Sequence, residues 1–466
     1  MMATSEQTVS RTGHTRVQWM LALIANSTLL LYGLETGWMS PMTKTLQSDQ
    51  SPVGSPISDS TLSMVASILC IAAVLSVLIY SYVADAYGRK AAVIAMALQQ
   101  SLSWIIRLSW KSTAGLLVAR ALSGFAAGGC FTIVPMYVKE ISQENIRGLL
   151  GSLLTVSQNS GIFIMYVMGA YIDYNTIIWI VFSIPLFTAV LMIKAPESPA
   201  FLVHKGRIQD AINSIAYLRG LDVNSKIVLN EVDTMKDQEL YYKTIPEISF
   251  VSIFRNRVWR RTVFLILLII SVHATNGAVA IITYGSSTLA SSGVQFSISP
   301  ELQTLSFPIV MMIGSFMSMS CVERFGRKPL LGGSLLISAS SMGTLGAALV
   351  LQSHGVSSPS WLPVLAMMMA LFAYGGGVLP MPFIIMSEML NYQIRAKVMG
   401  LAVTYSWFMS FFQLYMYSPI SASLGQHANF FFYCGINLAG FFICLLFIPE
   451  TKGKSDEEIE EELRKK

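Results

Sequence analysis

The chain has 466 residues, of which 53% are hydrophobic and 12% are charged, whereas soluble proteins carry about 25% charged residues. This composition excludes an ordinary soluble domain and places most of the chain in a lipid bilayer. The net charge of +5 is modest, and it does not favour nucleic acid as a partner.

Twelve apolar stretches are each long enough to cross the hydrocarbon core, which needs about 20 helical residues. Because lipid does not tolerate unpaired backbone groups, such long stretches predict helices. Six come before a long polar segment and six after it, so we expect an all-α integral membrane protein. They lie at residues 17–40, 61–84, 91–109, 114–138, 149–171, 177–194, 262–285, 301–321, 329–351, 362–386, 397–420 and 429–448.

This layout predicts four units along the chain. We expect an N-terminal six-helix half at 1–195 and a cytoplasmic linker with helices at 196–258. A C-terminal six-helix half at 259–450 and a cytoplasmic tail at 451–466 follow.

The lysines and arginines predict the orientation in the membrane. If the N-terminus is cytoplasmic, all but four of the 31 basic residues fall in cytoplasmic segments, the exceptions being Lys44, Arg107, Lys111 and Arg120. Basic residues accumulate on the cytoplasmic side of membrane proteins. We therefore expect a multi-pass protein of the plasma membrane with both termini in the cytoplasm.

Short surface helices are predicted on the cytoplasmic side. Apolar residues recur at helical spacing in 208–218, up to Gly220, and 231–242 is a second, more polar candidate. A third begins at Ser455, in the manner of an N-cap, and runs to about 464. The alternative is a partly disordered linker.

Three unlike motifs recur in the same order in the two groups of spans. Three matches in register favour two homologous halves, and such halves in an apolar chain are typical of secondary transporters, whose substrate site lies between them. The matches are 85–90 (DAYGRK) with 323–328 (ERFGRK), Glu140 and Arg147 with Glu388 and Arg395, and 196–199 (PESP) with 449–454 (PETKGK).

The charged members of these motifs predict a gate at the cytoplasmic mouth. Glycine permits the tight turn before each Arg-Lys pair, and the arginine can reach a carboxylate at the end of another helix. Exposed ion pairs contribute about 0–1 kcal/mol each, which suits a latch between states of similar energy. The alternative is that these residues only set the topology. The predicted gate comprises Asp85, Arg89, Glu140, Arg147, Glu323, Arg327, Glu388 and Arg395.

Two ionisable residues fall inside apolar spans, Glu35 in the first and Arg120 in the fourth. A buried charge in a membrane helix requires a partner and indicates a functional site. We therefore expect these two side chains to pair. The alternative is a static pair near the outer face, which Arg120 approaches with its long side chain.

The chain resembles the sugar porter family of the major facilitator superfamily over about residues 17–455. Within that family it resembles the insect trehalose and hexose transporters. The resemblance implies a 6+6 helix arrangement, alternating access and a central sugar site. It rests on Arg120-x3-Gly124-x3-Gly128, 135–140 (PMYVKE), Arg147-Gly148, 196–199 (PESP) and 449–453 (PETKG).

The polar residues of the family's sugar site are largely replaced. The seventh-helix pattern Gln-Gln-x-x-Gly-x-Asn aligns with 273–279 (HATNGAV), where only the glycine is kept. Amides offer two donors and an acceptor to neighbouring hydroxyls, and losing several can cost a factor of about 10⁴ in preference. The site residues that the resemblance implies, with the polar neighbours that remain, are Thr155, Gln158, His273, Asn276, Tyr284, Phe383, Ser406 and Trp407.

Specific roles are expected for two of these aromatic residues. Tyr284 matches a family tyrosine that helps to close the outer side. Trp407 can stack on a sugar ring, with an ordinary packed aromatic as the alternative.

The resemblance also implies a role for Glu35 and Arg120. In the related bacterial xylose–proton symporters an aspartate and an arginine pair at the matching positions, whereas facilitators carry a neutral residue at the first. Glu35 is therefore expected to bind a proton and couple its entry to solute movement. His273 is a second titratable group, for which a simple hydrogen-bonding role is the alternative.

Together these features predict transport of a small hydroxylated solute, a hexose or trehalose-like sugar, by rocking of two halves. The sequence shows no catalytic set, nucleotide-phosphate loop or metal-ligand spacing, so we expect no enzyme, cofactor or metal. One alternative is an orphan major facilitator with a non-sugar solute, which the replaced site favours. Another is a non-transporting nutrient receptor, against which the short tail argues.

Overall fold

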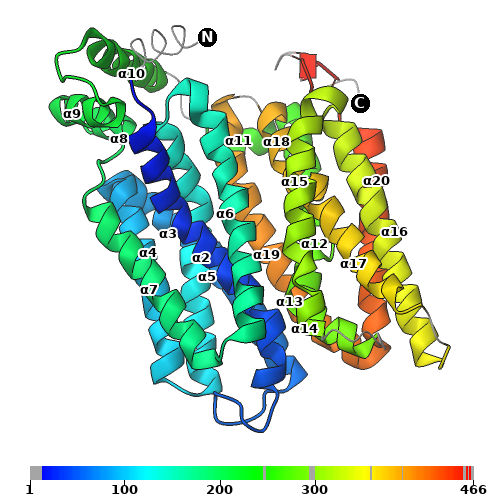
Figure 1. Ribbon diagram of the computed structural model, residues 1–466. Helices are drawn as coiled ribbons and strands as arrows, with labels where there is room; N and C mark the ends of the chain where they lie inside the picture. Colours follow the sequence, from blue (N-terminus) through cyan, green and yellow to red (C-terminus); the bar gives the residue numbers. More distant parts are fainter. Residues whose placement is uncertain are drawn as a thin grey trace, which may run out of the picture.

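The computed structural model describes residues 13–244, 248–292, 300–356, 359–390, 392–454, 458–459 and 461–462. In these residues the secondary structure is helical, with no β-strand. Figure 1 shows long helices running side by side, with the start of α2 (Arg16–Leu46) and the end of α20 (Gln426–Phe447) at the same end of the bundle. Most of the predicted tail helix, including Ser455, lies outside the described residues.

The first six membrane helices form one half of the bundle. Within it α2 packs along α6, where a Cβ on Gly33 would lie 2.0 Å from the carbonyl oxygen of Gln158 and one on Gly161 would lie 2.1 Å from that of Leu30. Bare glycines at these two positions therefore let the two backbones touch. The helices are α2, α3 (Asp59–Tyr87), α4 (Arg89–Ser109), α5 (Thr113–Ile141), α6 (Glu144–Tyr171) and α7 (Tyr174–Ile193).

The second six spans form the other half, and two of them are interrupted. The seventh span consists of α12 and α13, and the tenth contains a π-helical segment, η1, between two α-helices; a short α14 (Pro300–Gln303) follows α13. The elements are α12 (Arg257–Thr275), α13 (Ala278–Ser291), α15 (Ser306–Phe325), α16 (Arg327–Ser353), α17 (Trp361–Ala373), η1 (Tyr374–Val378), α18 (Met381–Met389), α19 (Tyr392–Leu424) and α20.

The expected twelve-helix, 6+6 architecture is confirmed. Eleven spans in the described residues are long and apolar enough to cross a membrane, with α12 and α13 counted as one and α17 to α18 as another. The twelfth is α19, which has 33 residues and packs against α3 of the other half.

Four short helices connect the halves: α8 (Pro199–His204), α9 (Ile208–Arg219), α10 (Lys226–Thr244) and α11 (Phe250–Arg255). The two helices predicted in this segment correspond to α9, which ends at Gly220 with a left-handed φ of 62°, and α10. Arg219 ties them to the first half, because it donates to the carbonyl of Ile141 at 2.9 Å and to Glu231 at 2.6 Å.

These connecting helices lie at the end of the bundle where α2 begins (Figure 1). Both Gly-Arg-Lys turns lie there too, between α3 and α4 and between α15 and α16. We call this the basic end and the opposite one the far end.

Candidate functional site

A cavity of about 190 Å³ lies between the two halves. One wall is the face of α6 that carries Ser152, Thr155, Val156 and Asn159, and the other comes from α15 and α18. Because α6 begins and α15 ends at the basic end, and the lining starts near those termini, the cavity lies in the part of the bundle nearer the basic end.

The wall opposite α6 is mainly apolar. It includes Met312, Phe316 and Met319 of α15 and Ile384 of α18. Ser315 is also in this wall, but its hydroxyl donates to the carbonyl of Met311 at 3.0 Å and of Gly375 at 3.3 Å. Ser318 adds a hydroxyl to this wall, and on the α6 side the Ser152 hydroxyl donates to the carbonyl of Leu149 at 2.7 Å. Both walls therefore carry hydroxyl groups, and the α6 side adds Asn159.

At the far end, hydrogen bonds across the halves converge on α13. Ser286 donates from its hydroxyl to the carbonyl of Ser40 at 2.6 Å, and the Ser40 hydroxyl donates to that of Ser286 at 3.1 Å. Tyr166 of α6 donates to the carbonyl of Ile282 at 2.6 Å. These contacts join α2 and α6 to α13, so the halves are closed together at the far end.

Tyr284 belongs to this closed end. Its hydroxyl donates to Ser63 of α3 at 3.2 Å, and its ring stacks on Tyr417 of α19 with centroids 4.2 Å apart and planes 8° apart. A role for Tyr284 in closing the outer side stays a prediction.

Trp407 lies near the middle of α19 and faces the other half. Its ring meets Tyr32 and Phe131 edge to face, each with centroids 5.8 Å apart. In this conformation the indole is packed against these two rings.

His273 and Phe383 contact each other inside the second half, with ring centroids 5.2 Å apart. The His273 Nδ1 lies 2.9 Å from the carbonyl oxygen of Val378, at the end of the π-helical segment η1. Since a carbonyl only accepts, Nδ1 carries the hydrogen. His273 therefore ties α12 to the irregular turn of the tenth span.

Asn276 completes the interruption between α12 and α13, where Gly277 adopts a φ of 97°. Its Oδ1 accepts from the backbone N–H of Ala278 at 2.8 Å, and its Nδ2 donates to the carbonyl of His273. Gln413, with its amide oriented to satisfy both groups, donates to Ala274 at 2.5 Å and accepts from the Gly277 N–H at 3.1 Å. In this conformation both polar atoms of the Asn276 amide are therefore hydrogen-bonded to the backbone.

The predicted substrate residues are accordingly dispersed in this conformation. Of the eight, Thr155 lines the cavity described above. Gln158 is buried where α6 crosses Gly33 of α2, and Ser406 is half-buried on α19. The sequence did not single out Asn159, which lies one turn beyond Thr155 in the same wall.

Glu35 and Arg120 form the expected pair. Arg120 Nη1 lies 2.9 Å from Glu35 Oε2 and also donates to the Glu35 carbonyl at 2.8 Å. The Ser123 hydroxyl donates to Glu35 Oε1 at 2.7 Å. All three side chains are buried.

A second arginine, one of the four basic residues outside the predicted cytoplasmic segments, completes this cluster. Arg107 of α4 places Nη2 2.6 Å from both Glu35 oxygens. Its guanidinium carbon lies 4.7 Å from the ring centre of Trp38 and 4.0 Å from that of Trp104. One carboxylate therefore faces two guanidinium groups, and the indole faces supply part of the attraction that a second anion would give.

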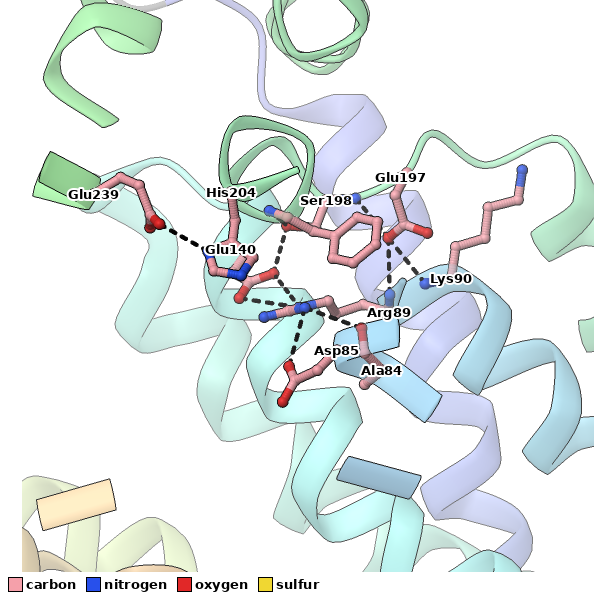
Figure 2. Close-up of polar contacts among 10 residues, drawn as sticks. Ala84, Asp85, Arg89, Lys90, Glu140, Glu197, Ser198, His204 and Glu239 are labelled. Atoms are coloured by element: carbon pink, nitrogen blue, oxygen red, sulfur yellow. Dashed lines mark hydrogen bonds and ion pairs between the residues drawn. The ribbon is translucent and has the colours of Figure 1, made fainter. Parts of the chain in front are cut away.

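At the basic end, Arg89 begins α4 and links three helices of the first half (Figure 2). Its Nε lies 3.1 Å from Glu140 of α5, and its Nη1 lies 3.4 Å from Asp85 of α3. The Ser198 hydroxyl donates to the same Glu140 carboxylate.

The second half repeats this arrangement. Arg327 lies 3.0 Å from Glu388 and 3.1 Å from Glu323, and the Thr451 hydroxyl donates to Glu388 at 2.5 Å. The sequence repeat therefore has a counterpart in the contacts of individual side chains.

Glu197 and Glu450 cap the helices that follow the two glycine turns. Glu197 accepts from the backbone N–H groups of Arg89 at 2.9 Å and Lys90 at 3.1 Å, as Figure 2 shows. Glu450 accepts from those of Arg327 and Lys328 at 3.0 and 3.1 Å. A carboxylate at a helix N-terminus satisfies free N–H groups and the helix dipole.

The turn glycines make room for these carboxylates. A Cβ on Gly88 would lie 2.2 Å from Glu197 Oε2, and one on Gly326 would lie 2.6 Å from Glu450 Oε2. Both glycines also have a positive φ, of 107° and 91°. This explains why glycine precedes the Arg-Lys pair in both halves.

The two capping carboxylates differ electrostatically. Burial raises the pKa of Glu197, and the N–H groups of Ser198, Lys90 and Arg89 offset this only in part. Burial also acts to raise the pKa of Glu450, but the N–H groups around it outweigh burial and hold that pKa below its usual value.

The ion pairs described here join helices of the same half. Arg147 and Arg395, which were expected to complete the clusters, donate to the backbone carbonyls of Ser142 and Leu390. In this conformation the clusters brace each half internally. A latch between the halves stays a prediction for the state in which the basic end is closed.

In comparison with known proteins, the family model and the curated relatives indicate the same family. The family model described as "Sugar (and other) transporter" matches residues 21–463. The facilitated trehalose transporter Tret1 of Anopheles gambiae is 26% identical over 449 residues, which are 96% of this chain but only 56% of that protein. Tret1 of Culex quinquefasciatus is 26% identical over 96% of this chain and 86% of its own length.

Solved structures support the same fold. The inward-open xylose transporter XylE from E. coli has a TM-score of 0.77 at 19% identity, covering 95% of this chain and 99% of that one. The proton:xylose symporter XylE bound to 6-bromo-6-deoxy-D-glucose has a TM-score of 0.71 at 20% identity, covering 97% and 100%.

Proposed function

This chain belongs to the sugar transporter family, and we propose on that basis that it carries a sugar of hexose or trehalose type across a membrane by alternating access. The observation that carries the proposal is the cavity between the halves near the basic end, combined with closure at the far end. A transporter that rocks around a central site passes through such a state.

The charge distribution supports an orientation for this state. With the basic end in the cytoplasm, the cavity faces inward and α13 closes the outer side. We place the protein in the plasma membrane, with both termini cytoplasmic and the bilayer as its surroundings.

The gate and the four units keep their predicted roles in this proposal. The halves 1–195 and 259–450 rock against each other. Of the linker, α9 moves with the first half through Arg219, and α11 moves with the second half, on which Ile253 packs. When the inner side closes, the clusters around Arg89 and Arg327 come to face each other across the cavity mouth.

Coupling to protons is proposed at Glu35. This carboxylate is buried with Arg107, Arg120 and Ser123 as its donors, and a buried carboxylate in a membrane helix is the usual carrier of a coupling proton. When the arginines withdraw from Glu35, proton binding removes an otherwise unpaired buried charge.

Uptake of labelled D-glucose, D-fructose and trehalose into proteoliposomes tests this function. Each uptake is measured with and without an inward proton gradient. We expect saturable uptake of at least one sugar, and accumulation above equilibrium only with the gradient. Absence of uptake of all three would overturn the sugar proposal.

A non-sugar solute is the second candidate. The apolar wall of Met312, Phe316, Met319 and Ile384 favours it, as does the loss of the family's seventh-helix amides. Protection from thermal unfolding, screened over small neutral and charged metabolites in the same protein, separates the two candidates.

A further inference from the structure

Asn159 is an exception among the buried asparagines of the described residues. Asn26, Asn276, Asn429 and Asn437 each donate at least one hydrogen bond from their Nδ2 atom. Asn159 is fully buried, and neither its Oδ1 nor its Nδ2 has a partner. A buried amide without partners is unfavourable, which makes Asn159 a candidate group for binding a ligand.

The position of Asn159 shows where that ligand lies. It lies seven residues beyond Ser152 along the cavity wall of α6, which places it about 10 Å deeper at 1.5 Å per residue. Thr155 precedes it by one turn and faces the same cavity. The α6 wall therefore carries hydroxyls nearer the basic end and, at its deep end, Asn159, whose unpaired amide atoms are covered in this conformation.

The opposite wall limits the chemistry of the ligand. Met312, Phe316, Met319 and Ile384 present apolar surface beside the smaller hydroxyl side chains of Ser315 and Ser318, and no charged side chain is among the described lining residues. A solute that fits both walls is neutral, with adjacent hydroxyls along one edge and an apolar C–H face on the other. The pyranose ring of a monosaccharide has this form.

The size of the cavity favours a single ring. At about 190 Å³ it is smaller than the roughly 300–1,000 Å³ of sites for drug-sized ligands. A disaccharide, with two rings, needs more space than a single ring.

We propose that Asn159 is the specificity-determining residue of the central site, where its amide pairs with adjacent ring hydroxyls of a monosaccharide whose apolar face lies on Met312 and Phe316. This inference rests on the proposed function. It goes beyond that function by placing the selecting amide on α6 and by favouring one sugar ring over two.

The test compares wild type with Asn159→Leu in proteoliposomes, using labelled D-glucose against its set of monodeoxy analogues and against trehalose. A site that pairs with a substrate hydroxyl rejects the analogue that lacks it. We expect wild type to prefer glucose over at least one deoxy analogue by about tenfold or more, and Asn159→Leu to reduce that preference to less than about threefold. Asn26→Leu, which removes a buried amide outside the cavity, should leave the preference unchanged.

The melting temperature of the purified protein without sugar provides a second readout. Asn159→Leu removes an unpaired buried amide, so it should melt at or above the wild-type temperature, whereas Asn26→Leu breaks a hydrogen bond and should melt lower. A lower melting temperature for Asn159→Leu would show that its amide has a structural partner and would overturn the proposal.

The outcomes distinguish failure of the role proposed for Asn159 from failure of the proposed transport function. If wild type takes up glucose and Asn159→Leu keeps the full preference, the role of Asn159 is wrong and the transport function stands. Transport of trehalose but no monosaccharide contradicts the single-ring inference alone. Absence of any sugar uptake overturns both.

Discussion

Arg107 binds Glu35 more closely than Arg120 does, at 2.6 Å against 2.9 Å. The Glu35 carboxylate thus bridges α2, α4 and α5 inside the first half. Because two cations share one buried anion, either arginine can leave while the other still neutralises Glu35. Glu35 can therefore pair with Arg107, with Arg120 or with both, and its charge is neutralised in each case. A coupling site requires such alternative pairings.

Replacing Glu35 by glutamine removes the proton-binding group while keeping its size. We expect Glu35→Gln to lose accumulation driven by a proton gradient and to retain sugar exchange across the membrane. Both are measured in the same proteoliposomes, so exchange serves as the folding control. Unchanged accumulation would falsify coupling through Glu35.

Replacing Arg107 by leucine leaves one cation for Glu35. Protonation of the carboxylate then competes with one arginine, so the pH at which proton-driven uptake is half-maximal should rise by about one unit or more. Arg107→Lys keeps the charge and is the matched control, with a smaller change expected. A half-maximal pH that does not move in Arg107→Leu contradicts this role.

The two arginines of the Gly-Arg-Lys turns test the inner gate. We expect the combined change Arg89→Ala with Arg327→Ala to bias the protein toward the inward-open state, because the latch predicted for the state with a closed basic end would lose the arginine of both clusters. Labelling of a cysteine introduced at Ser152 should become faster. Lys236→Ala, which breaks an exposed pair with Asp233 on α10, is the control, and equal labelling in both would count against the gate.

Tyr284 offers a graded test of the outer closure. Tyr284→Phe loses the hydrogen bond to Ser63 but keeps the stacking on Tyr417, and Tyr284→Ala loses both. We therefore expect a small shift toward the outward-open state for the first and a large one for the second. Labelling of a cysteine at Ser40 by an impermeant reagent reports the opening, and identical labelling of all three proteins would exclude a closing role.

The two capping carboxylates predict opposite pH dependences of stability. Glu450 has a lowered pKa in the folded protein. Its contribution to the free energy of unfolding is therefore present when the pH is above the ordinary glutamate pKa, and it is lost as pH falls through the lowered pKa. Glu197 has a raised pKa, so its contribution is present below the ordinary value and is lost as pH rises through the raised pKa.

Glutamine variants make this difference measurable. The quantity to compare is the amount by which each variant melts below wild type. As pH falls, this difference should become smaller for Glu450→Gln and larger for Glu197→Gln. Melting curves between about pH 3 and pH 7 extend to both sides of the ordinary glutamate pKa of about 4.3. The same trend in both variants would refute the assignment.

Repeats and hydropathy predicted the helices, the two halves and the pairing of Glu35 with Arg120, because these depend on local pattern and on the need of a buried charge for a partner. Arg107 was missed because a basic residue near the end of a span has the same sequence appearance as one at the membrane surface. Its burial depends on Trp38 and Trp104, which come from different helices.

Asn159 was missed for a related reason. Many asparagines in helices bond to their own backbone, as Asn26 does with Ala22, and sequence spacing does not tell which one is left without a partner. Conversely, Asn276 was predicted as a substrate residue because it is polar and lies in an aligned pattern. Its use by the backbone depends on the break after α12, which only the three-dimensional packing reveals.

The break between α12 and α13 decides which parts of the second half move as one body. The backbone groups that have no partner within α12 or α13 bond to Gln413 from α19 and, at the carbonyl of Asn276, to Asn437 from α20. Tilting α13 alone would strand these groups in a medium that offers no water. The helix that seals the outer side is therefore joined to α19 and α20 by these hydrogen bonds. Separation of α13 from Ser40 and Ser63 then moves α19, the helix that carries Trp407, along with it.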